Sequence, residues 1–197
     1  TDMNQPLGNT IGNAIEIREA IETLKGHGPK DFTELCMQAA EIMLMQGKVA
    51  ENKEEARKML DEVVASGKAF ETFKDMVKAQ GGNVDMIENP ELLPQSKFKT
   101  EIKSEESGNV KVLHSERLGV LAMQLGAGRE TKEQDVNHAV GLELACKRGD
   151  KVNKGDTICI VYHDEELKPQ WVDELYHAFE LTNEEVAPQP IIEKVLS

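Results

Sequence analysis

The sequence predicts an α+β fold, with helices in the first half and a small antiparallel α+β domain in the second half. Two observations support this class. Apolar residues recur at helical spacing in the first half, whereas they alternate as in strands in the second half. Between the halves, residues 83–97 are polar and contain Pro90 and Pro94, which interrupt helices. The expected division is a helical part over residues 1–82, a linker over 83–97 and a carboxy-terminal domain over 98–197.

Four amphipathic helices are expected in the first half. Three of them begin with an Asn or Asp that is followed three residues later by Glu, which is the capping-box spacing, at Asn13, Asp31 and Asn52. The fourth helix ends at Gly81 and Gly82. Each apolar stripe needs a surface to cover, so these helices either pack on one another or flank a sheet.

The second half alternates strand and turn signals. Strands are predicted by alternating apolar residues at 98–102, 110–113, 140–146 and 157–162. Turns are predicted at 107–109 and at two Gly-Asp pairs, 149–150 and 155–156. A short helix is expected from Ser115 to the glycines at 126 and 128, a longer helix over 169–181, and an edge strand over 191–196. This order predicts a small antiparallel domain of the barrel-sandwich type.

Charge restricts the partners that this chain can bind. The net charge is −13, with 36 acidic against 23 basic residues. Nucleic acid and anionic membranes require a basic surface, so neither is expected as a partner. No apolar run approaches the roughly 20 residues that cross a bilayer. The acidic, helix-rich first half also allows an interaction scaffold as an alternative role.

The cysteines indicate a reducing compartment. Cys36, Cys146 and Cys159 are odd in number and far apart, and none belongs to a Cys-x-x-Cys pair. They are expected to be reduced thiols of a cytoplasmic protein rather than part of a disulfide framework or a zinc site. The five histidines show neither metal-ligand spacing nor a nucleophile partner.

Several motifs carry a resemblance to a known enzyme family. They are TDMNQPLGN at 1–9, GNAIEIREAI at 12–21, LGAGR at 125–129, D-x-x-x-x-V-G at 135–141 and G-D-x-V-x-x-G-D at 149–156. Together they resemble the carboxy-terminal part of the pyrimidine-nucleoside phosphorylases, close to thymidine phosphorylase. The chain lacks an initiating Met and begins inside a motif, so we expect it to be a piece of a longer protein.

The resemblance implies a function for the longer enzyme. It would be a pentosyltransferase of nucleoside salvage that converts a pyrimidine nucleoside and phosphate into the free base and a pentose 1-phosphate. The helices of residues 1–82 would then be the remainder of a mixed α/β domain. The phosphate-binding and base-binding segments of the family lie upstream of this region. We therefore expect no catalytic residue and no organic cofactor in this chain, no activity of the chain alone, and a homodimer for the full-length enzyme.

One site of the family falls inside this chain. The resemblance implies a monovalent cation, usually potassium, bound by the backbone carbonyls of Leu7 and Thr10 and by the carboxylate of Glu19. An irregular loop exposes carbonyls that a helix would use internally, and a large, hard cation prefers several oxygen ligands. Relatives often carry a small apolar residue at the position of Thr10, which a backbone ligand tolerates.

A carrier module is the main alternative reading. The strand, Gly-Asp turn and strand over 140–162 resemble the fold of biotinyl and lipoyl carrier domains. Those domains present a modified lysine as Met-Lys-Met or Asp-Lys-Ala, and neither string occurs here. The similarity would then be one of fold alone.

Overall fold

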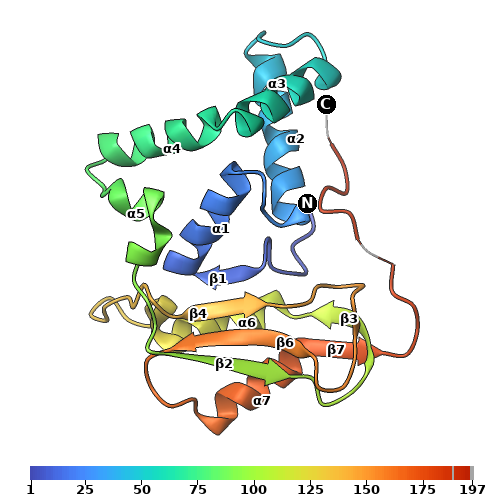
Figure 1. The fold of residues 1–197 in the computed structure, drawn as a ribbon. Coiled ribbons are helices and arrows are strands. Elements are labelled where there is room, and N and C mark those ends of the chain that lie inside the picture. The colour runs from blue at the N-terminus through green and yellow to red at the C-terminus, as the bar shows by residue number, and fades with distance from the viewer. Residues whose placement is uncertain (188, 196–197) are drawn as a thin grey trace. The chain divides into compact units, whose positions relative to one another are not determined.

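The computed structural model describes residues 1–187 and 189–195. The chain forms two compact units, one made of Thr1–Ile17 with Pro94–Ser197 and the other of Arg18–Leu93 (Figure 1). The first unit contains two antiparallel sheets and two helices, whereas helices dominate the second. The predicted α+β class is therefore confirmed.

This division differs from the boundaries expected from composition. Residues 1–17 belong with the carboxy-terminal part, because β1 (Thr10–Gly12) is a strand of its larger sheet. The expected linker contains α5 (Asp85–Glu88) and a 3-10 turn over Pro90–Leu92, which belong to the helical unit. Pro90 opens that turn at a position where its missing N–H costs nothing.

Two sheets build the first unit. The larger has the order β1-β4-β6-β2, with β4 at Gly141–Leu144, β6 at Thr157–His163 and β2 at Phe98–Lys103. The smaller has the order β5-β3-β7, with β5 at Lys151–Val152, β3 at Gly108–Leu113 and β7 at Phe179–Thr182. All pairings are antiparallel, and β1 forms one edge of the larger sheet (Figure 1).

Two helices complete this unit and share its core. They are α6 (Ser115–Ala122), which continues into a π-helical turn over Met123–Ala127, and α7 (Pro169–Ala178). Both sheets and both helices contribute fully buried side chains, namely Val110, Leu113, Leu118, Leu142, Val161 and Leu175. One apolar core therefore holds the first unit together.

Both predicted Gly-Asp turns are confirmed. Gly149 and Gly155 have positive φ angles of 95° and 92°, which favour glycine. The carboxylate of Asp150 accepts a hydrogen bond from the N–H of Lys147 at 2.8 Å, and that of Asp156 accepts one from the N–H of Asn153 at 2.8 Å. Each turn is therefore closed by its own aspartate, which explains the repeat of this pair in the sequence.

The predicted end of the last helix, at residue 181, is wrong. The helix expected over residues 169–181 ends at Ala178, and β7 begins at the next residue. Phe179 pairs with Leu113 and Glu180 with Val112 on β3, and the Phe179 side chain is buried. Because this partner strand lies more than sixty residues away in the sequence, local periodicity gave no sign of the change.

One predicted strand and one predicted turn also differ from the structure. Residues 191–195 contain no strand, and residue 196 lies outside the described residues. Instead, the carbonyl of Ile191 accepts a hydrogen bond from the N–H of Asp2 at 2.8 Å. The turn expected at 107–109 also lies earlier, because Gly108 and Asn109 are the first residues of β3.

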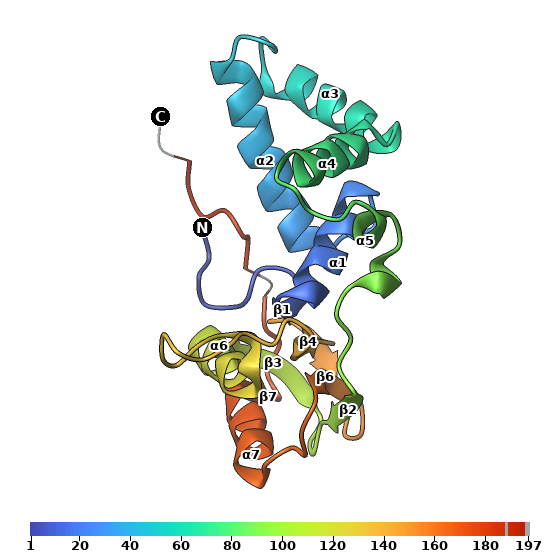
Figure 2. The ribbon, with the colours of Figure 1, turned by 90° about the vertical axis from the view of Figure 1, so that its left-hand side faces the viewer.

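The second unit is a set of helices. It contains most of α1 (Ala14–Leu24), together with α2 (Lys30–Gln46), α3 (Lys53–Ala65) and α4 (Lys68–Ala79). Helix α3 contacts both α2 and α4 (Figure 2). The core of this unit is small, since α4 contributes no buried residue and Glu41 is the buried residue of α2. Large apolar side chains are exposed here, namely Met43, Val49, Val63, Met76 and Leu92.

The predicted caps of the second and third helices have different outcomes. The Asn52 side chain accepts a hydrogen bond from the Glu55 N–H at 2.9 Å, so the predicted cap of α3 is confirmed. Helix α2 instead begins at Lys30 with Pro29 in the cap position, which places Asp31 inside its first turn.

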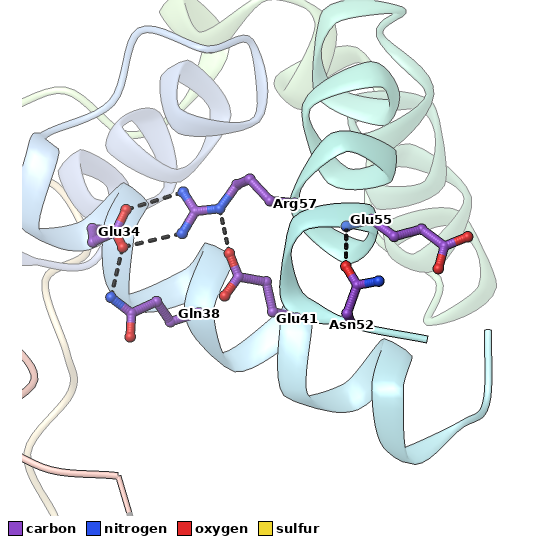
Figure 3. A network of polar contacts seen from close by, with 6 residues as sticks. All are labelled: Glu34, Gln38, Glu41, Asn52, Glu55 and Arg57. Atoms are coloured by element: carbon purple, nitrogen blue, oxygen red, sulfur yellow. Dashed lines mark hydrogen bonds and ion pairs between the residues drawn. The ribbon is translucent and has the colours of Figure 1, made fainter. Parts of the chain in front are cut away.

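An arginine joins α2 to α3. The two terminal nitrogens of Arg57 donate to the two carboxylate oxygens of Glu34 at 3.0 and 3.1 Å, and its Nε donates to Glu41 (Figure 3). Gln38 also donates to Glu34, at 2.6 Å. The hydrogen bonds from Arg57 are the main reason that the pKa of Glu34 lies below its usual value. The network thus fixes the register of two helices that share few buried contacts.

Candidate cation site

The loop that opens the chain is folded around a buried carboxylate. Asp2 is only 5% exposed, and its two oxygens accept hydrogen bonds from the Asn4 N–H at 2.9 Å and from the Gln5 side-chain amide at 3.1 Å. These bonds form a turn immediately before Pro6. The polar TDMNQP string is therefore a structured segment that leads the chain into the predicted ligand loop.

A lysine that follows β4 in the sequence, Lys147, binds this loop. The Lys147 ammonium donates hydrogen bonds to the backbone carbonyls of Pro6 and Gly8, the second at 2.6 Å. The N–H of the next residue, Arg148, bonds the Gln5 side-chain oxygen at 3.3 Å. The predicted ligand Leu7 therefore lies between two carbonyls that already attract a positive charge.

Strand register determines where the Thr10 carbonyl points. The N–H of Leu144 donates to the carbonyl of Asn9 at 2.7 Å, so Thr10 and Glu143 form a non-hydrogen-bonded pair. In such a pair the backbone groups point away from the partner strand. Because β1 is an edge strand, the Thr10 carbonyl points off the open edge of the sheet. The backbone of Gly12, two residues later, also points away from β4, and its N–H donates to the Glu16 carboxylate at 2.9 Å.

Glu19, the third predicted ligand, belongs to the other unit. It is half-buried on α1, and its backbone carbonyl accepts a hydrogen bond from the Thr23 hydroxyl at 2.8 Å. Leu7 lies in the opening loop and Thr10 is the first residue of β1, both in the first unit. Glu19 stays a prediction of the resemblance.

The start of α1 differs from the predicted cap. The Asn13 side-chain amide donates to the carbonyl of Ala127 at 2.8 Å, and the N–H of Ala14 bonds the carbonyl of His138 at 3.0 Å. Asn13 thus links the GNAIEIREAI motif to LGAGR. The Glu16 carboxylate reaches back as a capping box requires, but it bonds Gly12.

Two glycines allow β1 to approach β4. Gly12 and Gly141 lie opposite each other. A Cβ on Gly141 would lie 2.4 Å from the carbonyl oxygen of Ile11, and one on Gly12 would lie 2.9 Å from that of Val140. No side chain fits in this space, so both motifs need glycine here.

Sequence reasoning missed Lys147. The residue lies two positions before the Gly149-Asp150 turn of a recognised motif, which is the one local signal that marked its neighbourhood. Its role depends on a contact across about 140 residues, which no local pattern reports. Among the described residues, no group of three or more His, Cys, Asp or Glu side chains could hold a metal ion.

Comparison with known proteins shows which enzymes this chain resembles. Residues 109–182 match the model of the pyrimidine nucleoside phosphorylase C-terminal domain. The chain matches the carboxy-terminal part of the pyrimidine-nucleoside phosphorylases. It is 44% identical over 197 residues to the pyrimidine-nucleoside phosphorylases of Staphylococcus aureus strains USA300 and NCTC 8325, and 44% identical over 196 residues to that of strain MSSA476. The resemblance inferred from the motifs is confirmed.

The match covers all of this chain but less than half of each relative. The matched region is 100% of the chain and 45% of the length of these phosphorylases. The comparisons do not favour the carrier-module alternative. Within residues 1–187 and 189–195, no helix is long and apolar enough to cross a membrane.

Proposed function

We propose that this chain is the carboxy-terminal part of a pyrimidine-nucleoside phosphorylase. The enzyme would transfer the pentosyl group of a pyrimidine nucleoside to phosphate, releasing the base and a pentose 1-phosphate in nucleoside salvage. The observation that carries the proposal is 44% identity along the whole chain to enzymes of that name. Contacts between the matched motifs support it, since Asn13 of the GNAIEIREAI motif bonds Ala127 of LGAGR.

The chain would contribute support rather than reacting groups. Its described residues offer no cluster of the kind that binds metal through side chains, and we place the phosphate-binding and base-binding groups in the upstream part of the enzyme. The chain alone is then inactive. Three free thiols and a net charge of −13 support a cytoplasmic enzyme that does not bind nucleic acid, and we propose that the full-length enzyme is a homodimer.

We also propose a monovalent cation, potassium, at the loop of Leu7 and Thr10. The outward Thr10 carbonyl supports this assignment, and the Pro6 and Gly8 carbonyls show that backbone oxygens of this loop bind a cationic group. The Leu7 and Thr10 carbonyls would be ligands, and Glu19 would add a carboxylate as the resemblance implies. When bound, the ion would neutralise the carbonyl dipoles and hold the loop in one conformation.

A chimaeric enzyme tests the function. This chain would replace the matching region of the S. aureus USA300 relative, and release of base from uridine and thymidine would be measured with phosphate present. We expect the chimaera to be active and the isolated chain to release no base above the blank. The intact relative is the positive control, and circular dichroism checks that each protein is folded. A folded but inactive chimaera would contradict the proposed function, and base release by the isolated chain would contradict the upstream location of the reacting groups.

A further inference from the structure

The hydroxyl group of Thr10 is unaccounted for by the fold. Its oxygen is buried and has no hydrogen-bond partner among the described residues. Buried polar groups are almost always hydrogen-bonded, so an exception needs an explanation. We propose that the Thr10 hydroxyl is a ligand of the monovalent cation, in addition to the Thr10 carbonyl. This inference rests on the proposed cation site, and it adds a side-chain oxygen to the ligands that the resemblance implies.

The direction of the side chain fits this role. Neighbouring residues of a strand point to opposite faces of the sheet. Ile11 packs against the apolar core of the first unit, so Thr10 points to the face that does not carry this core. A threonine that only filled space there would lose nothing by being valine, whereas its hydroxyl adds a polar atom in a buried place.

The surrounding loop presents backbone oxygens to cationic groups. Lys147 places a positive charge on the carbonyls of Pro6 and Gly8, within the segment that leads into Thr10. The loop thus binds one monovalent cation, an ammonium, through backbone oxygens. Thr10 forms a non-hydrogen-bonded pair with Glu143, so the Thr10 carbonyl points off the edge of the sheet. A hydroxyl oxygen with two lone pairs beside such a carbonyl suits a large cation that prefers neutral oxygen ligands.

The test compares the isolated chain with two variants, Thr10→Val and Thr10→Ser. Valine keeps the shape and the β-branching but removes the oxygen, and serine keeps the oxygen. Thermal unfolding would be followed by Trp171 fluorescence in a potassium chloride titration, with choline chloride holding the ionic strength constant. We expect the wild-type midpoint to rise with potassium and to saturate. Thr10→Val should weaken the apparent potassium affinity by about tenfold, which corresponds to ~1.4 kcal/mol, and Thr10→Ser should restore most of it.

In choline chloride without potassium, the expected effect of Thr10→Val on stability is reversed. Without potassium, Thr10→Val should be at least as stable as the wild type, because it removes a buried hydroxyl that lacks a partner. A clear loss of stability in choline would show that the hydroxyl has another partner, such as water, and would overturn the inference.

The remaining outcomes separate the inference from the proposals on which it rests. If Thr10→Val responds to potassium as the wild type does, Thr10 is no side-chain ligand, although the cation site stands. If the wild type shows no response specific to potassium, both the cation site and this inference fail for this chain. Neither result affects the chimaera assay, which tests phosphorolysis separately.

Discussion

Replacing Lys147 with methionine should release the loop that opens the chain. The ammonium binds the carbonyls of Pro6 and Gly8, and methionine keeps a similar apolar stem while it removes the charge and both donors. The two carbonyls would then have to find water. Because the loop leads directly into β1, loss of this contact should also loosen the pairing of β1 with β4.

The expected cost follows from the two hydrogen bonds. A hydrogen bond to a charged group contributes about 1.5–3 kcal/mol when its partner stays buried. Lys147 is half-buried, so water can replace part of what is lost. We therefore expect a destabilisation of about 2 kcal/mol, which corresponds to a fall in the unfolding midpoint of roughly 4–8 °C for a chain of this size.

Hydrogen exchange locates the effect. In the Lys147→Met variant, the amide of Leu144, which bonds the Asn9 carbonyl, should exchange faster than in the wild type. Lys147→Arg keeps the charge and should therefore lose less stability than Lys147→Met. Lys151→Met is the matched control, because Lys151 is an exposed lysine four residues away. The reasoning is refuted if Lys147→Met matches Lys151→Met in both midpoint and Leu144 exchange.

Three further predictions test the packing, the ion network and the thiols. Gly141→Ala should destabilise the first unit by about 1–3 kcal/mol in chemical denaturation, because its Cβ would lie 2.4 Å from a backbone oxygen. Gly119→Ala, on an exposed helical glycine with open space around its Cβ position, should be neutral or stabilising by about 0.5–1 kcal/mol, and an equal loss in both would contradict the argument. Glu34 has a pKa below its ordinary value of 4.5, chiefly through hydrogen bonds from Arg57, so its contribution to stability is complete above that value and is lost as pH falls through the lower folded pKa. Glu34→Gln should therefore flatten the acid limb of a stability-versus-pH curve, and an unchanged limb would argue against the network. Alkylation followed by mass spectrometry should modify Cys36, which is exposed, in the native chain, while the other two thiols react after unfolding, since burial raises the pKa of each to about 12.

Local signals predicted the parts of the fold whose partners are near in sequence. The Asn52 cap, the two Gly-Asp turns and strand β6 all depend on residues within a few positions of one another. Short-range hydrogen bonds and side-chain alternation determine these features, so a pattern of five to seven residues contains the needed information.

Contacts distant in sequence limited the rest of the prediction. Strand β7 replaces the end of a predicted helix because β3 pairs with it, and the Asn13 side chain, which was predicted to cap a helix, bonds the LGAGR segment. Helix and strand propensities of such short stretches differ by less than these tertiary contacts contribute. The candidate site shows the same limit. Family motifs predicted Leu7 and Thr10, whereas the role of Lys147, which depends on a contact distant in sequence, came from the structure.

By itself, the sequence determined the α+β class, the resemblance to the pyrimidine-nucleoside phosphorylases and the residues proposed to bind a cation. Motifs and hydrophobic periodicity predict these features because both are patterns of residues that lie close together in the sequence. The tertiary structure alone decided that residues 1–17 join the carboxy-terminal unit, that the Thr10 carbonyl points off a sheet edge, and that its hydroxyl is buried without a partner. The pairing of β1 with β4, a strand about 130 residues away, joins residues 1–17 to that unit, and its register sets the direction of the Thr10 carbonyl.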